Sequence, residues 1–315
     1  MRIVFLGTPQ FALAPLEACL AFAGGEVAAV ITQPDRPVGR GHKLQMPPVK
    51  RLALERGLPV HQFERLRRQE GLDLLRALKP DLMVTAAFGQ ILSQKILDIP
   101  PLGVINVHAS LLPAYRGSAP IQWAIYHGEE KTGVSIMYTA RGVDTGDVIL
   151  RRELAIGPEE TGGELTCRLS RLGAQALTEA LGLIARGEAA RHPQDEALSS
   201  HYPMIDKADG ELDWTRPAAA LHDQIRAFDP APGCFTTCPE GVLKVWRSQR
   251  VDPPRAGAPG QVLLADPKGG LVVAAGEGAL ALTEIQGPGG KRMRSADYLR
   301  GHPMAEGAVL GAEHA

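Results

Sequence analysis

Two polar side chains stand at the end of an apolar segment predicted to be a buried strand over residues 104–107. Asn106 and His108 are two residues apart, and since strand side chains alternate, both point to one side of a sheet. An amide can donate to a developing oxyanion, and an imidazole can donate to it or move a proton. Asp144, in a glycine-flanked turn between Gly142 and Gly146, can approach His108 or act through water as a base. These residue types could stabilise an oxyanion and move a proton, and no Ser or Cys in a nucleophile elbow indicates a covalent enzyme nucleophile.

Each of these residues also has an ordinary structural interpretation. A lone Asn or His on a strand is more often a paired polar group of the core, and Asp144-Thr145-Gly146 is typical of a simple turn. The order of the residues, with Ser110-Leu111-Leu112-Pro113 directly after His108, favours a site over the separate structural readings.

The segment from residue 104 to 147 closely resembles the formyltransferase family that uses 10-formyltetrahydrofolate. In that family an Asn, a His and an Asp are catalytic and the Ser-Leu-Leu-Pro turn lies against the folate. The resemblance implies no metal and a catalytic trio at Asn106, His108 and Asp144, in which Asn106 and His108 stabilise the oxyanion and Asp144 aids the proton transfer. It also implies folate contacts at Ser110, Leu111, Leu112, Pro113, Phe88, Gly89 and Ile91. The segment that contains the last three is equally well interpreted as plain core.

Residues 34–48 form a segment rich in Pro and Gly that is predicted to be a basic loop. A solvated surface loop is the ordinary interpretation, but basic loops beside a crevice also bind phosphates. The motif Q-P-D-R-P-V-G-R-G-H-K-L is similar to a loop that methionyl-tRNA formyltransferases direct at the acceptor end of tRNA. The resemblance implies tRNA contacts at Arg40 first, then at Arg36 and Lys43, and also at Lys207, the one lysine that matches a basic family motif.

The first part of the chain predicts an α/β fold with a doubly wound, Rossmann-like, mostly parallel sheet. A strand over residues 2–7, a helix over 11–22 and a strand over 27–31 form a β-α-β start. The segment Gly7-Thr8-Pro9-Gln10-Phe11-Ala12 lacks the G-x-G-x-x-G pattern, so we do not expect a dinucleotide site. Further strands are predicted over 81–86, 133–138 and 148–150, and helices over 49–56, 72–78 and 161–185, the last with Thr161 and Glu164 at the spacing of a capping box.

The second part of the chain predicts a smaller, OB-like β-barrel. Five short strands are expected over residues 235–237, 242–250, 260–265, 270–274 and 279–286, after a helix over 217–227. We therefore expect a catalytic domain over residues 1–190, a linker over 191–206 and a tRNA-binding domain over 207–315. The basic residues of this second domain form two clusters, one at Lys244, Arg247, Arg250 and Arg255 and one at Lys291, Arg292 and Arg294. Such clusters can bind phosphates, but the solvated faces of strands have the same composition.

Composition excludes some other classes of protein. The net charge is −1 over 315 residues, so no overall charge indicates a nucleic acid or a membrane as partner. The four cysteines are scattered, and Cys234 and Cys238 have no second pair at zinc-site spacing. The apolar run over residues 3–6 is too short for a signal peptide, and that over 82–92 is too short for a membrane span. We expect a soluble, cytoplasmic protein and a monomer.

The resemblance to methionyl-tRNA formyltransferases covers essentially the whole chain, including A-P-I-Q-W-A-I, D-K-A-D-G-E-L-D-W and I-R-A-F-D-P-A-P-G. It implies transfer of the formyl group of 10-formyltetrahydrofolate to the amino group of methionyl initiator tRNA, giving N-formylmethionyl-tRNA for translation initiation. A formyltransferase acting on a nucleotide-linked amino sugar is the alternative within the family. A nucleotide-dependent dehydrogenase lacks its glycine fingerprint here, and a non-catalytic RNA-binding protein leaves the trio without a purpose.

Overall fold

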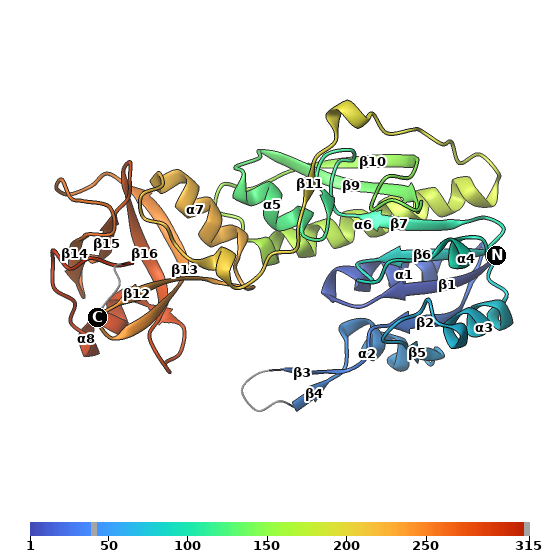
Figure 1. The fold of residues 1–315 in the computed structure, drawn as a ribbon, viewed down its shortest axis with the longest axis horizontal. Coiled ribbons are helices and arrows are strands. Elements are labelled where there is room, and N and C mark those ends of the chain that lie inside the picture. The colour runs from blue at the N-terminus through green and yellow to red at the C-terminus, as the bar shows by residue number, and fades with distance from the viewer. Residues whose placement is uncertain (39–42, 312–315) are drawn as a thin grey trace. The chain divides into compact units, whose positions relative to one another are not determined.

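The first strand of the chain, β1 (Arg2–Gly7), lies inside a seven-stranded sheet in the computed structural model, which describes residues 1–38 and 43–311 (Figure 1). The order of the strands is β10-β9-β7-β6-β1-β2-β5. The other strands are β2 (Glu26–Thr32), β5 (Val60–Gln62), β6 (Leu82–Ala86), β7 (Val104–His108), β9 (Lys131–Tyr138) and β10 (Val148–Ala155).

The five strands from β7 to β5 are parallel, and β9 and β10 are antiparallel. Every residue of β6 is buried, as expected for a parallel strand with both faces covered. The predicted Rossmann-like, mostly parallel sheet is therefore confirmed. Because the chain passes from β1 to β2 on one side and later to β6 on the other, the strand order reverses at β1 and β6. Ligands of such sheets bind outside the carboxyl ends of the strands at this reversal.

Helices cover this sheet and supply its core. They are α1 (Leu13–Ala21), α2 (Pro48–Glu55), α3 (Gln69–Leu78), α4 (Gln94–Leu97) and the long α6 (Gly162–Ala185). One core cluster joins Val4 and Leu6 of β1 to Leu75 of α3 and Ile96 of α4. The predicted capping box before α6 is confirmed, because the backbone N–H of Thr161 donates to Glu164 Oε2 (2.9 Å) and that of Glu164 to Thr161 Oγ1 (3.3 Å).

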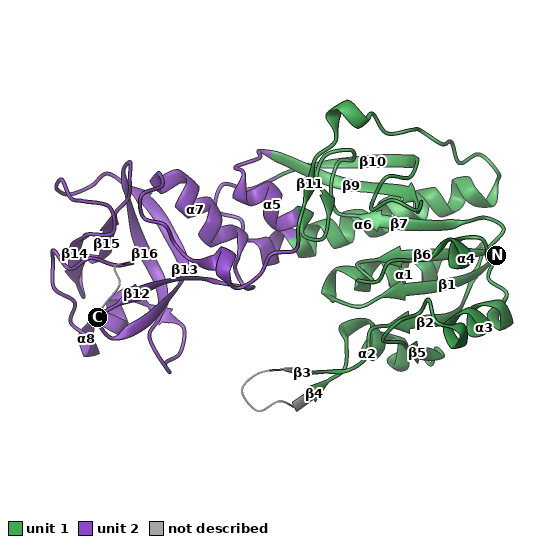
Figure 2. Ribbon diagram, viewed as in Figure 1, with its two compact units in different colours: residues 1–120, 131–155, 166–203 green, residues 121–130, 156–165, 204–315 purple. Residues whose placement is uncertain are grey.

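Contacts divide the chain into two units (Figure 2). Unit 1 comprises residues 1–120, 131–155 and 166–203, and unit 2 comprises residues 121–130, 156–165 and 204–315. Most of the segment expected to be a linker, residues 191–206, therefore packs as part of unit 1. The expected limits of the domains, at residues 190 and 207, stay predictions.

Unit 2 contains an antiparallel sheet of short strands. The order is β12-β13-β16-β15-β14, with β17 (Met293–Arg294) paired to β16. The five predicted strands are present as β12 (Cys234–Cys238), β13 (Gly241–Val251), β14 (Val262–Asp266), β15 (Gly270–Ala274) and β16 (Ala279–Gln286). With α5 (Pro120–Tyr126), α7 (Ala218–Ala227) and α8 (Ser295–Gly301), they form the separate strand-rich fold that was expected to be OB-like.

The prediction that residues 34–48 form only a loop is wrong. β3 (Arg36–Val38) and β4 (Lys43–Gln45) pair antiparallel inside this segment, with Arg36 opposite Gln45 and Pro37 opposite Leu44. Proline signals a loop, but it is tolerated in a strand whose N–H needs no partner, as in an isolated two-stranded ribbon. Two further differences concern the seven-stranded sheet. It includes β5, a strand that the sequence does not predict. Its strand β10 continues to Ala155, five residues beyond the predicted end at residue 150.

Candidate active site

Asn106 is held in place by a neighbouring strand. It lies on β7 opposite Thr85 of β6, and Thr85 Oγ1 donates a hydrogen bond to Asn106 Oδ1 at 2.8 Å. Thr85 Oγ1 also lies 3.2 Å from the backbone oxygen of Ile105, and its shorter contact uses the oxygen of the Asn106 amide. The two N–H donors on Nδ2 are then left for another acceptor.

His108 is buried, with 6% of its surface exposed, and both ring nitrogens face oxygen atoms. Nε2 lies 2.9 Å from the backbone oxygen of Tyr115, and Nδ1 lies 3.6 Å from Asp144 Oδ2. Because a carbonyl oxygen only accepts, Nε2 carries a hydrogen in this arrangement. Nδ1 is therefore the ring nitrogen that can exchange a proton.

Asp144 reaches His108 from the loop between β9 and β10. Its backbone is left-handed, with φ of 54°, a conformation that Asp tolerates better than most residues. The backbone N–H of Gly117 donates to Asp144 Oδ2 at 2.9 Å. Gly146 is required in this loop, since a Cβ there would lie 1.8 Å from the Tyr138 backbone oxygen. The structure thus brings Asp144 and His108 together beside the strand that carries Asn106.

The Ser110–Pro113 turn is fixed to β9. Ser110 is fully buried, and Ser135 of β9 links two points of the turn: its Oγ donates to the Ser110 oxygen (2.7 Å) and accepts from the Leu112 N–H (3.0 Å). Leu112 is buried in a small apolar cluster, and the Leu112–Pro113 peptide is cis. Leu111 and Pro113 are partly exposed, so their side chains have surface left for a ligand.

The segment after β6 lies at the strand reversal. Phe88 is 4% exposed and belongs to the apolar core, whereas Ile91 is 73% exposed. Gly89 has φ of 78°, and its backbone oxygen and that of Phe88 accept hydrogen bonds from Gln33 Nε2 at 3.1 and 3.3 Å. Of the three residues predicted here, Ile91 has its side chain turned to solvent and Phe88 has its side chain in the core.

The structure describes the residues predicted to bind tRNA only in part. The Arg36 guanidinium pairs with Glu64 at 2.7 Å, and both side chains are more than half exposed. For Lys43 only its position in β4 is described, and Arg40 lies outside the described residues. Lys207 is exposed and precedes a short 3-10 helix, Ala208–Gly210.

Sequence reasoning missed two residues that hold the trio. Thr85 is a polar residue in the otherwise apolar β6, the same signal that drew attention to Asn106. Gln194 binds the backbone of the Asp144 loop, and nothing in its sequence context indicates this.

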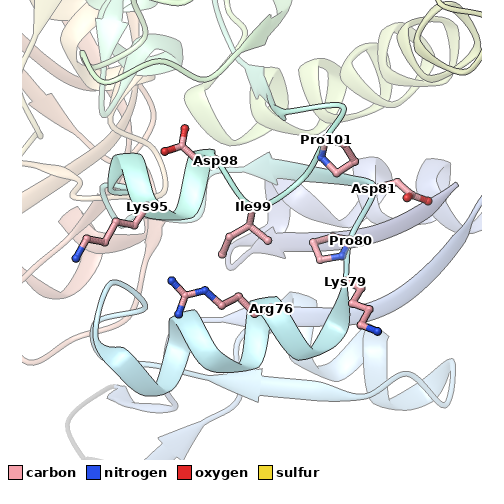
Figure 3. Close-up of a pocket in the computed structure, with 8 residues that line it drawn as sticks. All are labelled: Arg76, Lys79, Pro80, Asp81, Lys95, Asp98, Ile99 and Pro101. Carbon is pink, nitrogen blue, oxygen red and sulfur yellow. The ribbon is translucent and has the colours of Figure 1, made fainter.

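A pocket of about 650 Å³ lies away from these residues (Figure 3). It is lined by residues just before β6 and β7, including Asp81 and Pro101, and so lies at the sheet edge opposite the carboxyl ends. Figure 3 shows the side chains of Lys79 and Lys95 pointing away from one another, so they do not converge on one ligand.

Within the ranges 1–38 and 43–311, no group of three or more His, Cys, Asp or Glu is placed to hold a metal ion. No helix in the described part of the chain is long and apolar enough to cross a membrane.

Comparison with known families distinguishes a formyltransferase from a dehydrogenase and from a non-catalytic RNA-binding protein. Residues 1–181 match the formyl transferase family model, and residues 204–303 match the model of the formyl transferase C-terminal domain. The chain belongs to the formyl transferase family. It is a formyl-transferring enzyme, which excludes the dehydrogenase and the non-catalytic RNA-binding protein.

Relatives and solved structures agree with this assignment. The methionyl-tRNA formyltransferase of Solibacter usitatus is 48% identical over 314 residues, covering 100% of both chains. That of Moorella thermoacetica is 48% identical over 311 residues, covering 99% of both. HypX from Aquifex aeolicus in complex with tetrahydrofolic acid has a TM-score of 0.63 at 18% identity; 95% of this formyltransferase aligns with 47% of that longer chain. An N-formyltransferase from Helicobacter canadensis has a TM-score of 0.61 at 17% identity, covering 90% and 97% of the two chains. These structures share the fold.

Proposed function

We propose that this formyltransferase transfers the formyl group of 10-formyltetrahydrofolate to the amino group of methionyl initiator tRNA, giving N-formylmethionyl-tRNA. The observation that carries this proposal is the 48% identity over the full length of both chains to a methionyl-tRNA formyltransferase. A match limited to the first unit would leave the acceptor open, because the second domain varies among formyltransferases. The proposed reaction belongs to translation initiation, which puts the enzyme in the cytoplasm. A monomer suffices for the site described, since all three members of the trio lie in unit 1.

In the proposed reaction the amine nitrogen attacks the formyl carbon, a C–N bond forms, and the bond from that carbon to N10 of the folate breaks. The oxygen of the formyl group gains negative charge in the transition state, and Asn106 donates to it through Nδ2. The amine loses a proton and N10 gains one. Nδ1 of His108, next to the Asp144 carboxylate, is the group that accepts and returns this proton.

The proposed folate site lies where the strand order reverses. The carboxyl ends of β6 and β7 bring the segment 88–91 and the Ser110–Pro113 turn to the same edge of the sheet. Ile91 is an apolar side chain exposed to 73% at this edge, and an exposed apolar group there suits a flat aromatic ring of the ligand. No metal is part of the proposed site.

The proposed tRNA contacts are electrostatic. Arg40, Arg36 and Lys43 lie in the basic segment after β2, and Lys207 precedes the strands of unit 2. In unit 2, Arg292 Cζ and Lys244 Nζ lie 5.1 and 5.3 Å from the centroid of the Trp246 ring. Basic side chains beside an aromatic ring suit the binding of nucleic acid, because the charges attract phosphates and the ring can stack on a nucleobase. The Asp229 carboxylate forms ion pairs with Arg247 (3.1 Å) and with Arg292 (2.8 Å). These ion pairs reduce the positive charge with which the two arginines can attract phosphates.

The test is formyl transfer from 10-formyltetrahydrofolate with three acceptors offered in parallel: methionyl initiator tRNA, glycinamide ribonucleotide and a nucleotide-linked amino sugar. We expect formylation of the tRNA alone, and its loss in Asn106→Ala and His108→Ala. The exposed Arg56→Ala serves as a control that keeps full activity. Transfer to the amino sugar would establish the alternative acceptor, and release of formate with no acceptor modified would overturn the proposed function.

A further inference from the structure

The side chain of Gln194 joins the Asp144 loop to a buried arginine. Its Nε2 donates to the backbone oxygens of Asp144 and Gly146, both at 2.8 Å. Its Oε1 accepts from Arg116 Nε and Nη2 at 3.1 and 2.9 Å. Two carbonyls require donors and a guanidinium requires an acceptor, so the amide has only one orientation that satisfies both sides. All four hydrogen bonds of this amide are used.

Arg116 is itself fixed. It is 6% exposed, and Nη1 and Nη2 bind the two carboxylate oxygens of Glu196 at 2.9 and 2.8 Å, a bidentate pair. The hydrogen bonds to Glu196 raise the pKa of the Arg116 guanidinium above its ordinary value. Gln194 is therefore bound on one side by a buried, charged guanidinium and on the other side by two backbone oxygens of the Asp144 loop.

The rest of residues 192–202 packs along the same site. β11 (His201–Tyr202) pairs parallel with β8 (Arg116–Gly117), and the backbone N–H of Tyr115 donates to Ser200 Oγ at 2.9 Å. Tyr115 supplies the oxygen that faces His108 Nε2, and Gly117 supplies the N–H that binds Asp144. The segment expected to be a linker thus contacts the backbone on both sides of the His108–Asp144 pair.

We propose that Gln194 is a positioning residue for formyl transfer, holding the left-handed turn at Asp144 so that its carboxylate faces His108. This inference rests on the proposed role of Asp144 in moving the proton. Asp144 has φ of 54°, a backbone conformation that L-residues enter at a free-energy penalty. The bonds from Gln194 to the backbone oxygens of Asp144 and Gly146 offset that penalty. Gln194 acts on the chemical step through Asp144 and leaves the binding of both substrates unchanged.

A double-mutant cycle with Asp144 tests this inference. Gln194→Ala is expected to lower kcat by about tenfold, with KM for folate and for tRNA changed by less than about threefold. In an Asp144→Asn background the same change is expected to lower kcat by less than about twofold, because the group that Gln194 positions is already inactive. Gln94→Ala is the matched control, since the side chain of Gln94 donates to Asp98 Oδ1 across one turn at α4, and the variant should keep wild-type kinetics.

Gln194→Glu provides a second variant in case Gln194→Ala does not fold. Glutamate keeps acceptors for Arg116 but places an anion against two backbone oxygens, so kcat should also fall while Arg116 stays paired. Wild-type kcat in either folded variant, or equal proportional losses with and without Asp144→Asn, would overturn the positioning role alone. Wild-type kcat in the Asp144→Asn single variant would instead overturn the proposed role of Asp144, and this inference with it.

Discussion

Nδ1 of His108 lies 3.6 Å from Oδ2 of Asp144, while Nε2 of the same ring faces the Tyr115 backbone oxygen at 2.9 Å. The carbonyl orients the ring and keeps the hydrogen on Nε2. The carboxylate therefore faces the nitrogen that exchanges a proton in the proposed reaction. A positive charge that forms on the ring during the reaction lies next to a fixed negative charge, which lowers the energy of that state.

Removing the charge of Asp144 should slow the chemical step. Asp144→Asn keeps an oxygen to accept the Gly117 N–H, so the loop should stay folded, but it removes the anion beside His108. We expect kcat to fall by about 10²- to 10⁴-fold, the range for loss of general acid–base catalysis. Steady-state kinetics across pH 5 to 9 measures this. Asp73→Asn, an exposed carboxylate of α3, is the control; a loss of less than twofold in Asp144→Asn would contradict the proton-transfer role.

The hydroxyl of Thr85 should matter to catalysis although it lies behind the site. Thr85→Val keeps the shape of the side chain and removes the donor to Asn106 Oδ1, so the amide can rotate away from the oxyanion. We expect kcat to fall several-fold, and the free energy of unfolding to fall by about 1 kcal/mol for the lost hydrogen bond. Thr85→Ser retains the hydroxyl and should restore kcat. Equal kinetics in the Val and Ser variants would show that the hydroxyl does not orient Asn106.

Gly117→Ala should break the pairing of β11 (His201–Tyr202) with β8 (Arg116–Gly117) beside the site, because the added Cβ clashes with β11. This Cβ would lie 2.1 Å from the Tyr202 backbone oxygen, at a residue with φ of 111°. Gly187→Ala provides the control, since its φ is 71° and nothing lies within 4 Å of the added Cβ. We expect Gly187→Ala to cost only the backbone strain, about 1 kcal/mol, and Gly117→Ala to cost more and lower kcat. Urea unfolding of both variants compares them, and equal losses would remove the steric argument.

The capping box at α6 should make stability fall in acid. The backbone N–H and the hydroxyl of Thr161 lower the pKa of Glu164 below its ordinary value of 4.5. An acid whose pKa is lowered by folding stabilises the folded state above its ordinary pKa, and this contribution is lost as pH falls through the lowered value. Glu164→Gln should therefore lose less stability than the wild type between pH 6 and pH 3. Urea midpoints at the two pH values measure this, and a steeper loss in Glu164→Gln would contradict it.

Arg40 should act through phosphate rather than through the chemistry. Arg40→Ala is expected to raise KM for methionyl-tRNA with little change in kcat, and to reduce the slope of log affinity against log salt by about 1. Lys95→Ala, which removes a cation that lines the pocket before β6 and β7, should change neither quantity. A fall in kcat at saturating tRNA, with an unchanged salt slope, would place Arg40 in the reaction instead.

Many elements of this protein can be predicted from its sequence, because the signals concerned are local. The apolar runs of β1 and β6, the alternating strands of unit 2 and the capping box of Thr161 and Glu164 all depend on neighbours within a few residues. Asn106 and His108 were recognised for the same reason, since the strand period places both on one side of the sheet.

The residues that hold Asn106, His108 and Asp144 in place become visible in the folded structure. Gln194 reaches the Asp144 backbone across 50 positions of the chain, and Arg116 reaches Gln194 across 78 positions. Hydrogen bonds between such distant partners leave no periodic signal in the sequence. The hairpin of β3 and β4 was likewise hidden, because prolines that forbid a central strand are allowed in a two-stranded ribbon. Local propensity is encoded residue by residue, whereas the partner of a buried polar group is chosen only when the whole fold brings the two together.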